Sequence, residues 1–362
     1  MRRALAAIAL LFAFSSAFAH TSGTSFLTLR AENASTVHAE WDFDLRDLHQ
    51  LLQLDRDGDG AVVWAEIVAA RPAIESLVLA RTRLSSEGGA CTLVSTEVPA
   101  IAEHGDGAYL RFIATFVCAA GPLALDHTGW LEFDAGHRAL LEYEAPDGTR
   151  SQAILSSGTA RWQSSESRAA HLTRFLLEGM RHLVMGYDHV AFLGVLLLAL
   201  ARRRRTDEST SLPHMLRRAF VVITAFTLAH SLTLALSATD HLRLPSQPVE
   251  VAIAASVMIA ALLNISRGAA QHGWKLAFAF GLVHGLGFAS ALAELASERI
   301  DLLALAAFNV GIEVAQIAIA AAAVPLIWWI FRDLRSERLG VLLASLSVAC
   351  VAAVWVATRL GV

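Results

Sequence analysis

The stretch that decides the fold is His182-Leu-Val-Met-Gly-Tyr-Asp-His189, which leads directly into an apolar run that ends at Ala201. The run predicts a membrane-spanning helix, because about 20 apolar residues are enough to cross the hydrocarbon core. Two imidazoles and a carboxylate therefore lie at membrane depth, where an unpaired charge costs several kcal/mol. Such groups usually face the interior of a helix bundle and mark an ion path or site. We expect a metal or proton pathway here.

The composition divides the chain into two parts. Of its 362 residues, 55% are hydrophobic and 17% are charged, and the mean hydropathy is +0.50. Charges and short β-rich runs alternate up to about residue 163, whereas long apolar segments follow one another beyond about residue 172. The pattern predicts an exported β-rich α+β domain followed by an α-helical polytopic membrane domain. The net charge of −4 and the lack of a basic stripe give no indication of nucleic-acid binding.

Six membrane spans are predicted from the apolar segments. They cover residues 173–201, 217–237, 249–266, 275–295, 302–331 and 340–358. Most basic residues between the segments fall on one side, as in the run from Arg202 to Arg205, and only Arg243, Arg299 and Arg359 fall on the other. Because basic loops mark the cytoplasmic side, we expect the N-terminal domain and the C-terminus outside the cytoplasm.

Residues 1–19 have the pattern of a secretory signal peptide, with a basic start, an apolar run and the cleavage site Ala17-Phe18-Ala19. The run is short for a membrane anchor, so we expect cleavage before His20. The predicted domains are a periplasmic domain at 20–155, a linker at 156–171 and a membrane domain at 172–362, in the inner membrane of a bacterium. Cleavage would free the amine of His20, and amine and imidazole together could chelate copper or nickel.

A twelve-residue calcium loop of the EF-hand type is predicted from residue 55 to residue 66. Its expected ligands are Asp55, Asp57, Asp59, Ala61 and Glu66, with the Ala61 oxygen coming from the backbone and Gly60 allowing the sharp turn. Helices are expected at 47–54 and 64–81, the second interrupted near Pro72. An acidic turn without an ion is the alternative. We expect Ca²⁺ as a cofactor, with an affinity of about millimolar.

Cys91 and Cys118 are predicted to form a disulfide. Both belong to the exported domain, where disulfides persist, and antiparallel pairing about a turn at 103–106 places them opposite each other. Two free buried thiols are the alternative. Further strands are expected at 25–31, 36–43 and 140–144, giving a small β-sandwich-like domain with the helix–loop–helix inserted.

Polar residues within the later spans form stripes along helix faces. The stripes are Thr224, Thr227 and His230 in one span and Asn309, Glu313 and Gln316 in another. His284 lies between Gly281 and Gly285, whose spacing allows another helix to approach closely. Each residue alone could serve as an interhelical hydrogen-bonding group. Their presence in four separate spans favours a function.

The spacing of His182 and His189 leaves two geometries open. Seven residues put them on one face of an ideal helix but about 10 Å apart along its axis. Either the helix opens near Gly186 or the two imidazoles act in series. Asp188 either binds an ion or orients a ligating imidazole. Imidazole and carboxylate together suit nickel, cobalt or zinc, whereas magnesium prefers oxygen ligands almost alone.

At these residues the chain resembles the HupE/UreJ family, whose members are regarded as permeases for nickel or related metals. The likeness covers residues 172–331 and includes His182 with Asp188-His189, the block from Phe226 to Ser231, the stretch from Gly281 to Phe288, and the block from Phe308 to Gln316. It departs from short family members in the added exported domain and in a fourth-span block without the extra His and Glu.

The resemblance implies that the protein is a permease for a divalent metal ion and not an enzyme, with Ni²⁺ as the first candidate and cobalt, zinc or copper as alternatives. The implied path comprises His182, Asp188, His189, His230, His284, Asn309, Glu313 and Gln316. Membrane lipid, the ion and metalloenzyme-maturation proteins are the expected partners. Two other classes remain: an intramembrane zinc-dependent hydrolase, and a calcium- or metal-sensing membrane protein without transport.

Overall fold

A computed structural model describes residues 23–104, 107–134, 136–201, 211–239, 241–242, 244–265, 273–287, 301–331 and 334–360. The chain divides into two compact units, one that ends at Phe175 and one that begins at Leu176. The predicted signal peptide and His20 lie outside the described residues, as do Arg202–Arg205, Arg243 and Arg299.

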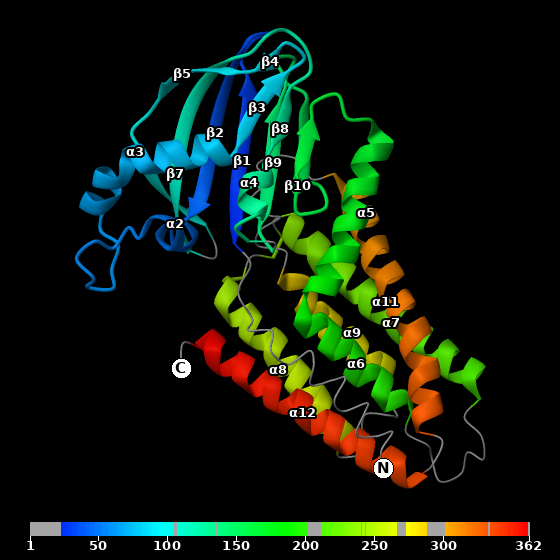
Figure 1. Cartoon of the computed structure of the whole chain (residues 1–362). Coiled ribbons are helices and arrows are strands. Elements are labelled where there is room, and N and C mark those ends of the chain that lie inside the picture. Colours follow the sequence, from blue (N-terminus) through cyan, green and yellow to red (C-terminus); the bar gives the residue numbers. More distant parts are fainter. Residues whose placement is uncertain are drawn as a thin grey trace. The chain divides into compact units, whose positions relative to one another are not determined.

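The N-terminal unit contains two β-sheets (Figure 1). The larger has the order β10-β9-β1-β2-β7-β5, with β6 also paired with β7, and the smaller has the order β11-β8-β3-β4. The strands are β1 Thr24–Ala31, β2 Thr36–Asp44, β3 Arg83–Ser86, β4 Gly89–Ala90, β5 Thr92–Thr96, β6 Ala100–His104, β7 Gly107–Val117, β8 Ala124–Asp126, β9 Arg138–Glu144, β10 Arg150–Leu155 and β11 Arg161–Gln163. Only β1 and β9 pair in parallel among the described strands. The predicted β-rich region is confirmed.

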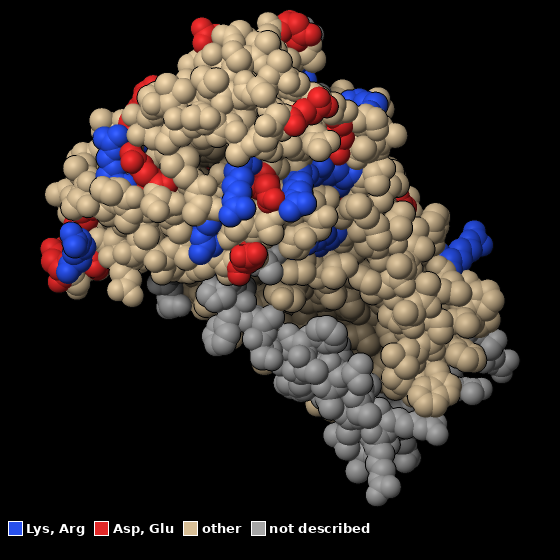
Figure 2. Space-filling model, turned by 45° about the horizontal axis from the view of Figure 1, so that its top comes forward, with Lys and Arg blue, Asp and Glu red and all other residues tan. Residues whose placement is uncertain are grey.

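Alternating burial along the strands builds the core of this unit. In β7, Phe112, Ala114 and Phe116 are buried on one face, as period-two alternation requires. Trp41 packs against Phe112 with ring centroids 5.7 Å apart. On the surface, acidic and basic side chains lie side by side, and neither sign forms an extended stripe on the face shown in Figure 2.

Helices α2 (Leu45–Leu52) and α3 (Trp64–Arg81) connect β2 to β3. Asp44 caps α2 by accepting a hydrogen bond from the backbone of Arg46, and Ile67, Ile74 and Val78 bury one face of α3. The predicted interruption near Pro72 is wrong, because α3 runs continuously through it. Pro72 is exposed, so water can hydrate the carbonyl that its ring leaves without an N–H partner. A short helix, α4, covers Thr128–Leu131.

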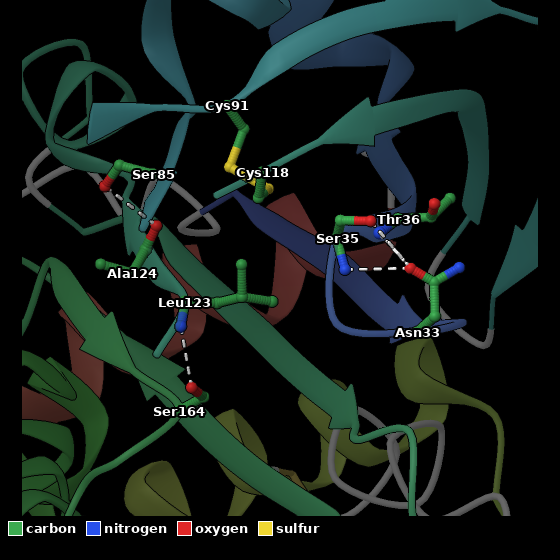
Figure 3. The surroundings of a disulfide bond; sticks show 9 residues. All are labelled: Asn33, Ser35, Thr36, Ser85, Cys91, Cys118, Leu123, Ala124 and Ser164. Atoms are coloured by element: carbon green, nitrogen blue, oxygen red, sulfur yellow. Dashed lines mark hydrogen bonds between the residues drawn. A yellow bond between two sulfur atoms is a disulfide. The ribbon is translucent and has the colours of Figure 1, made fainter. Parts of the chain in front are cut away.

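The disulfide between Cys91 and Cys118 is present (Figure 3), as predicted. The backbone N–H of Cys118 donates to the carbonyl of Ser35 at 2.8 Å. Asn33 Oδ1 in turn accepts from the backbone of Ser35 and of Thr36, each at 2.9 Å. Cys118 is therefore held both by the disulfide and by a hydrogen bond to a turn that has hydrogen bonds of its own.

The hairpin register differs from the predicted one. At the turn, His104 pairs with Gly107, so the predicted turn at 103–106 is wrong. An irregularity between Leu93 and Ser95 shifts the register farther along, and Thr92 pairs with Val117. The two cysteines therefore meet through an irregular ladder, which cannot be predicted by counting residue pairs from the turn.

The predicted linker at 156–171 is also structured. It contains β11, whose Trp162 is only 3% exposed and which pairs with β8. Ser164 Oγ accepts from the backbone of Leu123 at 2.9 Å (Figure 3). The Ser-rich composition suggests a loop, but burial of the tryptophan fixes this segment on the smaller sheet.

The second unit is helical. Its elements are α5 Arg168–Met185, which begins before the unit boundary, α6 Tyr187–Ala201, α7 Leu212–Ala238, α8 Ser246–Ile265, α9 Gly273–Leu286, α11 Leu302–Ile330 and α12 Leu334–Leu360. In Figure 1, α8 lies beside α12 and α7 beside α9, and the contacts between these helices agree. The packing brings together helices that are distant in sequence.

Four described helices are long and apolar enough to cross a membrane, namely α7, α8, α11 and the part of α12 from Arg338. Helices α5 and α6 form a fifth candidate span that is bent by 73° at its break. The chain is thus a multi-pass membrane protein. The predicted span at 275–295 is described only to Gly287, so the count of six stays a prediction.

Candidate metal site in the helical unit

Three imidazoles from three helices converge within the helical unit. His182 of α5, His189 of α6 and His230 of α7 each offer one ring nitrogen, and these nitrogens all lie within 4.8 Å of one another. His189 and His230 are 6% and 0% exposed. His284 of α9 is close by, with its ring centroid 4.7 Å from that of His189. The sequence-predicted histidines therefore form one cluster.

The break between α5 and α6 produces this convergence. The two helices are separated at Gly186, and the bend brings the rings of His182 and His189 to 4.9 Å between centroids. A Cβ at Gly186 would lie 2.8 Å from His189 Nδ1 and 2.9 Å from the carbonyl oxygen of His182. Of the two geometries that the sequence left open, the structure has the opened helix.

Asp188 orients His189. Its Oδ1 lies 2.9 Å from His189 Nδ1, and because a carboxylate only accepts, the proton is on Nδ1. The lone pair of Nε2 is then available, and this buried atom makes no hydrogen bond. The second oxygen of Asp188 pairs with Arg359 of α12 at 3.3 Å. Asp188 therefore acts behind the imidazole, as carboxylates behind metal-binding histidines do.

Arg359 was predicted only as a topology signal, yet it connects three helices. Besides Asp188, its guanidinium donates to the carbonyl of Glu250 near the start of α8 at 2.8 Å. Its Nε also lies 3.8 Å from the Glu250 carboxylate. No spacing in the sequence joins position 188 to position 359, so the pair could not have been predicted from a motif.

The stripes of α7 and α11 face each other. Asn309 Oδ1 lies 3.2 Å from His230 Nδ1, which places the proton on Nδ1 because an amide oxygen accepts. His230 Nε2 is buried without a hydrogen bond. Two further contacts connect the stripes, Thr224 to Glu313 at 2.8 Å and Thr227 to Gln316 at 3.0 Å. The predicted polar residues of the two spans thus form a continuous interhelical contact.

His284 is held by a contact with α8. Its Nε2 lies 2.9 Å from Ser256 Oγ of α8, a residue that the sequence analysis did not select, and its buried Nδ1 makes no hydrogen bond. Gly281 and Gly285 allow the close approach of α9 to α7, since a Cβ at either would lie 2.5 Å from a backbone oxygen of α7. The predicted role of these glycines is confirmed.

The predicted calcium loop lies in the other unit. One oxygen from each of Asp55, Asp57 and Asp59 lies within 4.8 Å of the others. Asp55 accepts from the backbone of Gly58 and Gly60 at 2.7 and 2.9 Å, and the Gly60 bond is the main reason that the pKa of Asp55 lies below its usual value. Gly60 has a φ of +87°, which favours glycine.

Glu66 completes this loop. Its carboxylate accepts from the backbone of Val63 at 3.0 Å and of Arg56 at 2.6 Å, and these bonds lower its pKa, the first contributing most. The twelfth position is therefore ionised and directed back across the loop. The donor set is all oxygen, which fits the hard Ca²⁺ ion.

The apolar helices and their buried imidazoles define a multi-pass membrane protein with a histidine cluster between its helices. The model of one protein family, described as HupE / UreJ protein, matches residues 159–359. Because the match covers more than half of the chain, the protein belongs to the HupE/UreJ family. The resemblance noted in the sequence is confirmed. A comparison with curated proteins gives no match.

Proposed function

We propose that this protein is a permease for a divalent transition-metal ion, with nickel as the first candidate. The observation that carries the proposal is the convergence of ring nitrogens from α5, α6 and α7 within 4.8 Å. Imidazole nitrogen suits nickel, cobalt, copper and zinc better than magnesium or calcium. Family membership supports the same class of substrate.

The path is inferred from the order of the polar groups. On the predicted topology, the last turn of α9, the last turn of α12 and the first turn of α8 all lie toward the exported side. His284, Arg359 and Glu250 occupy these turns or lie next to them. An ion would then reach the histidine cluster from outside and continue along the contact between α7 and α11, past Gln316 and Glu313.

Ion flux tests this proposal. Purified protein in proteoliposomes is offered nickel, cobalt, zinc and copper separately, and uptake is compared among the wild type, His189→Ala and His230→Ala. We expect loss of at least nine-tenths of the flux in both variants, because each removes one converging nitrogen. His214→Ala is the matched control, since His214 is an exposed residue of the same helix α7. Normal flux in both cluster variants would refute the path.

We also propose that the loop from Asp55 to Glu66 binds Ca²⁺ and organises the exported unit. Titration calorimetry of the full-length protein should show calcium binding that Asp55→Ala abolishes. Asp147→Ala provides the control, because Asp147 also accepts backbone hydrogen bonds in a turn but lies outside the loop. If the wild-type protein releases no heat with calcium, the loop is an acidic turn that binds no ion.

An intramembrane zinc-dependent hydrolase is the second candidate. Three imidazoles with Asp188 behind one of them resemble the protein ligands of a catalytic zinc ion, which keeps one position open for water. Here the three nitrogens supply the ligands and Asp188 remains engaged with Arg359. Zinc-dependent cleavage of a lipid by the purified protein, without ion flux, would favour this reading over the permease. Binding without flux or cleavage would favour a sensor.

A further inference from the structure

The β-rich unit contains a second pair of metal-ligating side chains that neither the calcium loop nor the helical site uses. Asp47 lies in the first turn of α2, and His137 lies directly before β9. His137 is 1% exposed. Its Nδ1 lies 3.5 Å from Asp47 Oδ2, yet both atoms are buried and neither makes a hydrogen bond. Buried polar atoms are rarely left in this state.

The surroundings hold the two atoms toward each other. The other ring nitrogen of His137 lies 3.0 Å from Ser25 Oγ of β1, so the ring orientation is fixed with Nδ1 near the Asp47 carboxylate. A Cβ at Gly23 would lie 2.0 Å from Asp47 Oδ2 and 2.9 Å from His137 Nδ1. Glycine at this position thus lets both side chains approach the backbone and each other, which any other residue would prevent.

The spacing of the two atoms fits ligands of one ion better than a direct bond. Charge-assisted hydrogen bonds of this type are about 2.7–2.9 Å long, which is shorter than the observed 3.5 Å. Two ligands that each lie about 2.1 Å from a metal and are 3.5 Å apart subtend an angle of about 110°, close to tetrahedral. Imidazole and carboxylate together select a borderline divalent ion.

We propose that Asp47 and His137 are two ligands of a divalent transition-metal site in the β-rich unit. The site is distinct from the calcium loop, which has oxygen ligands only, and it does not depend on transport by the helical unit. Water or exchangeable ligands complete the coordination. The unit would therefore hold a transition metal on the predicted exported side of the membrane.

Counting bound ions tests the proposal. Full-length protein carrying His189→Ala and His230→Ala, which disable the helical cluster, is equilibrated with cobalt in the presence of saturating calcium. We expect one cobalt ion per chain with the visible absorption of a tetrahedral site. Adding either Asp47→Asn or His137→Gln should weaken binding at least tenfold and remove this absorption. His38→Gln is the control, because His38 is an exposed imidazole of the same sheet that also contacts a carboxylate.

Folding is followed in the same samples. Asp47→Asn preserves the size of a side chain that is 14% exposed, so hydrogen exchange in β1 and β9 should match that of the parent without cobalt. Cobalt should slow this exchange in the parent and leave it unchanged in Asp47→Asn. Absence of a bound ion in the parent would overturn the proposal. An ion that remains in both variants would do the same, because other groups, such as an N-terminal His20, would then hold it.

Discussion

At the scale of single residues, Arg359 determines how Asp188 can act. The guanidinium holds one carboxylate oxygen at 3.3 Å while the other faces His189. We expect Arg359→Gln to leave the imidazoles in place but to loosen the orientation of His189. Losses of this kind usually weaken metal affinity about 10–100-fold.

Equilibrium dialysis with nickel on the detergent-purified variant measures this loss. Arg338→Gln is the matched control, because Arg338 belongs to the same helix α12 and is exposed. Equal nickel affinity in Arg359→Gln and the wild type would show that Asp188 orients His189 without the arginine.

The histidines that could bind a metal could be predicted from the sequence, whereas the residues that orient these histidines could not. The sequence indicates His182, His189 and His230 because ionisable side chains are rare within apolar spans and usually have a function there. Ser256 and Arg359 are not, since a serine within a span and an arginine near a chain end are common. Only the packing of α8 and α12 against the cluster assigns them a role.

At the scale of elements, the break between α5 and α6 could not be decided from the sequence. A glycine in an apolar run is compatible with both a continuous helix and an open one. The predicted span at 173–201 is in fact two helices bent by 73°. The bend, rather than helical periodicity, makes residues seven positions apart neighbours.

Gly186→Ala tests this element. The new Cβ would lie 2.9 Å from the backbone oxygen of His182 and 2.8 Å from His189 Nδ1, so the His189 ring and the backbone at the break must shift. We expect the metal flux in proteoliposomes to fall at least tenfold while the protein remains folded. Gly194→Ala in α6 is the matched control, because a Cβ there meets nothing within 4 Å. Equal flux in both variants would show that the break tolerates a side chain.

At the scale of the whole molecule, the chain joins a unit rich in ion pairs to a unit made of apolar helices. The larger sheet carries a partly buried cluster in which Asp42 accepts from Arg111 at 2.6–2.8 Å and faces His104 at 2.8 Å. Burial acts to raise the pKa of Asp42, but the hydrogen bonds from Arg111 and His104 outweigh it and hold the pKa below the ordinary 3.8. Composition predicted the charged unit, but the cross-strand partners depend on the register of β2 and β7.

This cluster predicts how the β-rich unit responds to acid. Because the folded pKa of Asp42 lies below its unfolded value, its contribution to stability is complete above about pH 4 and is lost as the pH falls through the folded pKa. The slope of the unfolding free energy against pH reaches at most about 1.4 kcal/mol per pH unit for one proton.

Asp42→Asn should lower the free energy of unfolding by about 2 kcal/mol at pH 7 and flatten its dependence on pH below pH 4. Hydrogen exchange in β2 and β7 of the full-length protein, corrected for intrinsic rates, measures both effects. Glu32→Gln, at an exposed pair with His38 on the same sheet, should change neither, and parallel curves for Asp42→Asn and the wild type would contradict the assignment.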